Sequence, residues 1–144
     1  ADNTTNQWAN STFNLWRGCT RVSPGCLWLN CYAERESKRN PTVLGVWGQK
    51  GTRVLAADNQ WIQPLKWNNK DEKSGEPWLV FCASLADIFE DWTGQMTDHQ
   101  GYFITMDNDY DSISACTKPW NDSKIDRPYT LNDARIKLWN YAKH

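Results

Sequence analysis

Three of the five cysteines, Cys19, Cys26 and Cys31, fall within thirteen residues of this 144-residue chain. A disulfide framework usually shows an even number of cysteines spread along the sequence, so this pattern favours a reducing compartment and a metal or cluster site. Cys82 lies in an apolar run and is expected in the core, whereas Cys116 is left without a role. The fold therefore has to accommodate three closely spaced thiols on one short segment.

The residues around these cysteines predict a strand, a loop and a helix in that order. β-Branched and aromatic residues mix with polar ones at near-alternate positions over residues 11–17, which is typical of a short strand. Residues 20–25 contain Ser-Pro-Gly and predict a loop, and residues 27–39 have helix-forming content that ends at Asn40-Pro41. The cysteines are thus expected at a strand–loop–helix junction.

The middle of the chain predicts a further helix and a buried strand. Asp58 is a plausible N-cap for a helix that runs through Trp67, with Pro64 as a point of strain or a break. Residues 78–83 form the clearest strand, a continuous apolar run of the kind that is buried in a parallel sheet.

The last third is less regular. Residues 92–128 are rich in Asp, Asn, Thr and Gly with little periodicity, which predicts an irregular acidic segment, although residues 102–106 could form one more strand. Residues 130–143 predict a closing helix with Thr130 as its cap. The resulting order of strand, helix, helix, strand, long loop and helix indicates an α/β fold.

Ser84 and Asp87 follow directly after the strand at residues 78–83. Ligand sites of α/β proteins form at the carboxyl ends of strands. We therefore expect this strand to lie beside residues 11–17, so that Ser84 and Asp87 approach the cysteine loop. Asp87 would then either contact a ligand or cap the next turn.

Length and charge restrict the class of protein. Residues 1–144 fit a single domain, and no apolar run approaches the length of a membrane helix. Residues 1–10 do not resemble an export signal, so we expect a cytoplasmic protein without a membrane partner. The net charge of −1 argues against generic nucleic-acid binding, which depends on neutralising phosphates. Basic residues predominate over residues 17–73 and acidic residues over residues 87–126, which predicts an electrically polar molecule.

Three thiolates on one loop suit an iron–sulfur cluster. They can hold a cubane cluster by three of its irons and leave the fourth iron open to an outside ligand. A structural zinc ion would need a fourth ligand, which would have to be Cys82, Cys116 or a histidine far along the chain. Zinc therefore remains the alternative to a 4Fe-4S cluster.

Four motifs make the pattern more specific: QWANSTFNLWRGCTRVSPGC at residues 7–26, CYAER at 31–35, QWIQPLKWN at 60–68 and FCASLADIF at 81–89. Together they resemble a phage-encoded protein family of unknown function that is distantly similar to radical-SAM proteins. The similarity covers roughly residues 6–91 and resumes weakly at Thr130. Members of that family have two residues between the last two cysteines, whereas four separate Cys26 from Cys31 here.

The resemblance implies a partial barrel-type sheet of the radical-SAM kind. It implies that Cys19, Cys26 and Cys31 bind a 4Fe-4S cluster whose open iron takes S-adenosylmethionine (SAM), which is then reduced to give an adenosyl radical. Ser84 and Asp87 are the candidate cofactor contacts. Family members continue beyond the last helix, so the chain is expected to correspond to the N-terminal part of the fold and to need a complementing chain.

Three functions stay open at this point. The first is a radical-SAM-like iron–sulfur protein of phage origin that works in the host cytoplasm. The second is a non-catalytic phage protein that binds a host protein through its acidic segment and some of its ten tryptophans. The third is a zinc-stabilised binding module.

Overall fold

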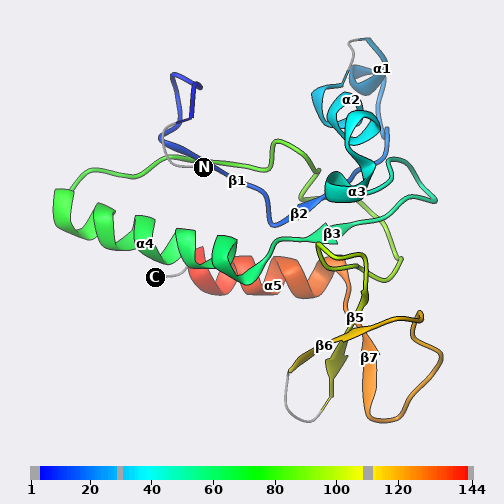
Figure 1. The fold of residues 1–144 in the computed structure, drawn as a ribbon. Coiled ribbons are helices and arrows are strands. Elements are labelled where there is room, and N and C mark those ends of the chain that lie inside the picture. The colour runs from blue at the N-terminus through cyan, green and yellow to red at the C-terminus, as the bar shows by residue number, and fades with distance from the viewer. Residues whose placement is uncertain (1–3, 29–30, 109–111, 143–144) are drawn as a thin grey trace.

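The computed structural model describes residues 4–28, 31–108 and 112–142 and has a mixed α/β fold (Figure 1). The α/β class expected from the sequence is confirmed. In chain order the elements are β1 (Ser11–Phe13), β2 (Trp16–Arg17), α1 (Gly25–Trp28), α2 (Tyr32–Arg39), α3 (Pro41–Leu44), β3 (Val54–Leu55), α4 (Asp58–Ser74), β4 (Val80–Cys82), β5 (Phe103–Asp107), β6 (Ile113–Cys116), β7 (Asp126–Pro128) and α5 (Leu131–Ala142).

Strand β1 pairs in parallel with β4, from Ser11 opposite Val80 to Phe13 opposite Cys82. The expected neighbourhood of these two segments is therefore confirmed, although both strands are shorter than expected. The pairing with β4 ends after β1, at Asn14. The side-chain oxygen of Asn14 accepts a hydrogen bond from the Leu85 N–H (2.8 Å). The chain then enters β2, which pairs with β3 instead, so the expected strand at residues 11–17 is divided between two sheets.

The remaining strands are antiparallel. β5 lies between β6 and β7, and Thr97 connects this sheet to β3 by bridging Val54 and Phe103. Figure 1 shows β5, β6 and β7 projecting away from the helices. Residues 92–128 contain β5, which coincides with the possible strand at residues 102–106, and also β6 and β7, which were not expected. β6 has four residues and is mostly exposed, so it is too short for a periodic apolar pattern to mark it as a strand.

The sheets are small, and no barrel is closed by the strands of residues 4–28, 31–108 and 112–142. The one parallel pair, β1 with β4, has two strands, and the other strand pairs of the described chain are antiparallel. The observed architecture is therefore a mixed α/β arrangement of small sheets, where a barrel-type sheet was expected.

The helix expected at residues 27–39 is two helices. α1 begins earlier, at Gly25, and α2 begins at Tyr32, with Cys31 directly before it. Residues 29–30 of the expected helix lie outside the described residues. α2 ends at Arg39, as expected, and Pro41 opens α3, because its fixed φ and missing N–H suit a first helical position.

Helix α4 passes through Pro64 and continues to Ser74, so of the strain or break expected at Pro64 the break does not occur. Its N-cap is Ala57, and Asp58 is already helical. An interior proline costs about 3 kcal/mol or more. Trp61 and Trp67 offset this cost, because α4 buries both side chains against the core, and burying one large apolar side chain contributes roughly 1.5–3 kcal/mol.

Helix α5 lies beside α4 (Figure 1), and the Tyr141 ring stacks on Trp61 with ring centroids 5.8 Å apart. Its bounds agree with the expected helix, of which residue 143 lies outside the described residues. Thr130 stands directly before α5, and its N–H donates to the Asp133 carboxylate (2.8 Å), as in one half of a capping box, while its hydroxyl donates to the same oxygen (2.8 Å). Among the residues that the structure describes, no helix is long and apolar enough to cross a membrane.

The hydrophobic core joins α4 and α5 to the strands. Trp16, Trp61 and Trp67 are buried in it, whereas Trp8 and Trp139 are exposed. The buried core residues are Phe13, Leu15, Trp16, Leu55, Ala56, Trp61, Trp67, Met96, Ile104, Tyr129, Leu131 and Ala134.

Candidate functional site

Cys19 follows β2 in a tightly held stretch of backbone. The Gly18 N–H donates to the Leu85 carbonyl (3.1 Å), and the Gly48 N–H donates to the Cys19 carbonyl (3.0 Å). Gly18 has a φ of 105°, and a Cβ at this position would lie 2.3 Å from the Thr52 carbonyl oxygen. Glycine is required here, because both the backbone angle and the close approach exclude a side chain. The start of the cysteine segment is therefore fixed to the residues that follow β4.

Cys26 and Cys31 lie at the beginnings of helices. Cys26 is the second residue of α1, and its sulfur is 3.6 Å from the Ser23 hydroxyl oxygen. Cys31 directly precedes α2, and its carbonyl accepts the Arg35 N–H (3.0 Å). These thiols and that of Cys19 are free and partly buried. The segment thus carries three thiols without a disulfide: Cys19 follows β2, whereas Cys26 and Cys31 belong to α1 and the start of α2, which form one corner of the molecule (Figure 1).

The three thiols do not form a preassembled metal site. Within residues 4–28, 31–108 and 112–142, no three His, Cys, Asp or Glu side chains are gathered closely enough to hold a metal ion. Their chemistry nevertheless fits an iron–sulfur cluster, because cluster irons take cysteine thiolates and these thiols are free. Cluster binding would therefore have to draw the thiols together.

Cys19 and Cys26 have different electrostatic surroundings. Burial, together with the negative charge of Glu90, raises the pKa of Cys19 to about 11. Hydrogen bonds from the Val22 backbone and from Ser23 lower the pKa of Cys26. The thiolate form, which is the nucleophile and the metal ligand, is therefore more accessible at Cys26 than at Cys19.

Ser84 and Asp87 lie in the segment that is hydrogen-bonded to the start of the cysteine loop. The Asn14 side-chain amide donates to the Ser84 hydroxyl (3.0 Å), one residue before the Leu85 carbonyl that accepts the Gly18 N–H. The Asp87 carboxylate accepts the Phe89 N–H (2.9 Å), which is the turn-capping role that the sequence left open. Its negative charge also makes a small upward contribution to the pKa of Cys19.

A buried ion pair that the sequence did not indicate lies beneath this site. Arg53 donates to both carboxylate oxygens of Glu90 (2.7 and 2.8 Å) and to the Thr20 hydroxyl (2.8 Å). The Trp16 ring N–H also donates to Glu90 (3.2 Å), and the Trp92 ring lies 4.8 Å from the Arg53 guanidinium. Arg53 follows a Gly-rich stretch, so no periodic pattern pointed to a buried cation.

An apolar cavity of about 380 Å³ lies between α4, α5 and β4. Cys82 lines it, and burial raises the pKa of this thiol to about 11. Cys82 is therefore half-buried at a cavity wall, where a core position was expected. Trp67, Trp78 and Trp139 supply further wall area.

Comparison with protein families adds to this geometry. The model of a family described as "Protein of unknown function (DUF5131)" matches residues 3–109. The chain belongs to this family. The part of the DUF5131 chain that matches includes the three cysteines, Ser84 and Asp87, and it also includes Arg53 and Glu90. Neither a curated protein nor a solved structure matches the chain.

Proposed function

We propose that this DUF5131 protein is a radical-SAM-like iron–sulfur protein of phage origin that holds a 4Fe-4S cluster through Cys19, Cys26 and Cys31. The observation that carries the proposal is the 3.1 Å hydrogen bond from the Gly18 N–H to the Leu85 carbonyl, which joins the cysteine segment to the carboxyl end of β4. Carboxyl ends of parallel strands are the places where α/β proteins bind their ligands.

In the proposed site the cluster, the cofactor contacts and the supporting ion pair would have separate roles. A bound cluster would supply electrons and an open iron that can ligate SAM. Ser84 and Asp87 would contact the polar groups of SAM from the β4 side, because their segment is tied to Gly18 and Asn14. The pair of Arg53 and Glu90 would keep the cysteine segment in place from below, through the hydrogen bond to Thr20.

The test is anaerobic purification after expression with excess iron, followed by iron, sulfide and zinc analysis. We expect about one 4Fe-4S cluster per chain, with visible absorption near about 400 nm. Replacing Cys19, Cys26 and Cys31 together by Ala should abolish the cluster, whereas Cys116→Ala, a matched change of a lone half-buried cysteine, should leave it intact. Stoichiometric zinc without iron would reject the proposal and favour the zinc-stabilised module.

The proposal includes a complementing chain. Among the residues that the structure describes, β1 and β4 form a sheet of two strands, which is marginal alone, so we expect a strand of another chain to extend it. We therefore expect reconstituted monomer, incubated with SAM and a strong reductant, to release no 5′-deoxyadenosine until the partner is added. Robust turnover by a proven monomer would contradict the need for a partner.

A second candidate function is the binding of a host protein in the cytoplasm without catalysis. Phe89 favours it, because this large apolar side chain is 78% exposed beside the exposed, acidic Asp91. Phe89→Ala should then abolish salt-sensitive co-purification of one host protein, whereas Val43→Ala, a truncation of another exposed apolar side chain, should not. Equal co-purification of the host protein with the two variants would contradict host-protein binding through Phe89.

A further inference from the structure

Two charged side chains connect the ends of the cysteine segment. Arg21 lies two residues after Cys19, and Glu34 lies three residues after Cys31. Arg21 donates from Nε (2.8 Å) and from Nη2 (2.6 Å) to the same carboxylate oxygen of Glu34. The contact therefore joins two residues that are thirteen positions apart and that enclose Cys26 and Cys31 between them.

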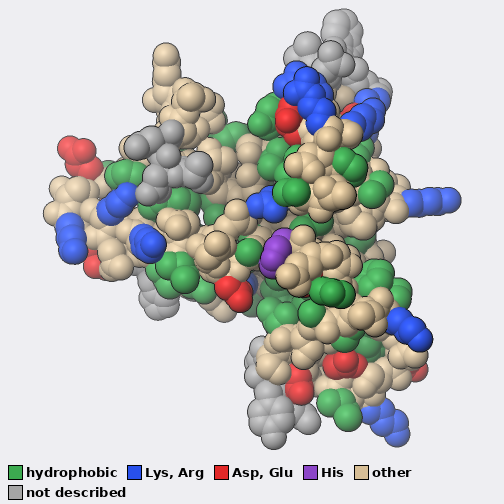
Figure 2. All heavy atoms as spheres, viewed as in Figure 1, with side chains coloured by type: hydrophobic (Ala, Val, Ile, Leu, Met, Phe, Trp, Pro, Cys, Tyr) green, Lys and Arg blue, Asp and Glu red, His purple; other side chains and the backbone are tan. Residues whose placement is uncertain are grey.

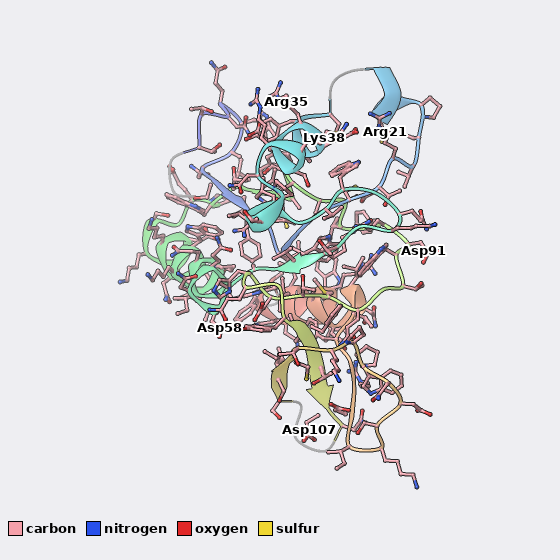
Figure 3. The ribbon with its side chains drawn as sticks, turned by 45° about the vertical axis from the view of Figure 1, so that its right-hand side comes forward. Arg21, Arg35, Lys38, Asp58, Asp91 and Asp107 are labelled. Carbon is pink, nitrogen blue, oxygen red and sulfur yellow. The ribbon has the colours of Figure 1, made fainter. Side chains whose placement is uncertain are left out.

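A third side chain completes the arrangement. Lys38, one helical turn after Glu34 on α2, places its ammonium 2.8 Å from the other carboxylate oxygen of Glu34. The Glu34 side chain is 11% exposed, and hydrogen bonds from Lys38 and Arg21 lower its pKa. In Figure 3 Arg21 and Lys38 lie near each other beside α2. Both oxygens of one nearly buried carboxylate are thus held by cations from the two ends of the segment.

The other ion pairs of α2 join residues of the same helix and do not extend to the loop. Glu36 pairs with Arg35 (3.3 Å) and with Arg39 (3.0 Å), all within the same helix. Such pairs support a helix, but they connect no distant parts of the chain. Figure 2 shows Lys and Arg side chains gathered with acidic ones over this corner of the molecule. Within this charged surface, Glu34 bridges Arg21 in the loop and Lys38 in the helix.

We propose that Glu34 is a positioning residue: with Arg21 and Lys38 it forms an ion-pair clasp that holds the ends of the cysteine segment together before any cluster binds. The clasp reduces the conformational freedom of the loop, so less ordering free energy is lost when the three thiols are drawn onto one ligand. The presence of the clasp does not depend on the proposed function, whereas its role in retaining a cluster rests on it.

The first test uses the protein without cluster and measures backbone hydrogen exchange over residues 20–28. Glu34→Gln should accelerate exchange there by about threefold to tenfold, as expected for losing a modest ion-pair network. Arg21→Gln should have the same effect, and the double variant should exchange no faster than either single one. Glu36→Gln, the same change two residues away, should leave the exchange unaltered, and high salt should reduce the difference between wild type and Glu34→Gln.

The second test measures iron retention after reconstitution, with a chelator as competitor. Glu34→Gln should lose iron several-fold faster than the wild type, and Glu36→Gln should match the wild type. If the wild type binds no iron while the exchange results hold, the proposed function fails and the clasp stands. Equal exchange in Glu34→Gln and Glu36→Gln, or additive effects of Arg21→Gln and Glu34→Gln, would overturn the clasp even in a protein that binds iron.

Discussion

Arg53 and Glu90, 37 residues apart in sequence, form a forked ion pair in which Nε lies 2.7 Å from Oε1 and Nη2 lies 2.8 Å from Oε2. The side chains are 0% and 2% exposed. Since Arg53 also donates to the Thr20 hydroxyl, the pair ties β3, the cysteine segment and the residues after β4 to one another.

Removing one charge of this pair should destabilise the protein strongly. Glu90→Gln leaves the Arg53 guanidinium buried without its counter-charge, so we expect a loss of about 3–5 kcal/mol in the free energy of unfolding. Urea denaturation of the wild type and of Glu90→Gln measures this difference in the free energy of unfolding. Glu36→Gln breaks an exposed pair and should change stability by less than about 1 kcal/mol. Similar small losses in both variants would show that Glu90 is solvated in solution.

Gly18→Ala should destabilise the protein because of a steric clash. Its φ of 105° is strained for alanine, and the added Cβ would meet the Thr52 carbonyl oxygen at 2.3 Å. Gly48 is the matched control, because its φ of 109° is similar and a Cβ there meets nothing within 4 Å. Gly48→Ala should cost only the backbone strain of about 1–3 kcal/mol, whereas Gly18→Ala should add the clash to a similar strain. We therefore expect a clearly lower melting temperature for Gly18→Ala than for Gly48→Ala. Equal melting temperatures would contradict the close approach.

Asp133 should make stability depend on acid pH. Burial alone would raise its pKa, but hydrogen bonds from Arg127 and Thr130 outweigh burial and hold the pKa below the ordinary value of 3.8. The folded-state pKa is thus lower than the unfolded one, so the carboxylate contributes stability above the unfolded value, and this contribution is lost as the pH falls toward the folded pKa. We expect Asp133→Asn to lower the urea midpoint at about pH 7 and much less at about pH 3. An equal reduction at both pH values would contradict this expectation.

Asp87→Asn should weaken SAM binding and leave the folded structure unchanged. The Asn side-chain oxygen can still accept the Phe89 N–H that Asp87 accepts (2.9 Å), so the turn should persist. Loss of the negative charge should weaken SAM binding by about tenfold, as for one hydrogen bond to a charged group, without changing the iron content. Equilibrium dialysis with labelled SAM measures the affinity. Unchanged affinity would leave Asp87 with the capping role alone.

Strongly apolar or strongly periodic segments were predictable from sequence. Residues 78–83 are continuously apolar and residues 130–143 have helical spacing, and β4 and α5 lie there, although the residues of β4 are only half-buried. The parallel pairing of β1 with β4 also followed, because α/β connections restrict which strands can be neighbours. Ser84 was expected to approach the cysteine segment; it lies beside Asn14, one residue before the Leu85 carbonyl that accepts the Gly18 N–H.

Features that depend on distant contacts were not predictable. Pro64 reads locally as a break, but Trp61 and Trp67 are held by packing that lies outside the helix, so α4 continues. β6 is short and mostly exposed, because its strand is defined by hydrogen bonds to β5 and not by burial. The Arg53 partner is 37 residues away, and no local pattern signals such a pairing.

The stacking of Tyr141 on Trp61 shows that the hydrophobic core extends further along the sequence than the family match does. The stretch shared with the family ends at residue 109, yet α5, which begins at Leu131, supplies side chains to the same core as α4. A truncated protein that stopped at residue 109 would leave the Trp61 indole uncovered on the α5 side. The residues that match the family model are therefore fewer than the residues that build the hydrophobic core, because α5 beyond residue 109 supplies part of that core.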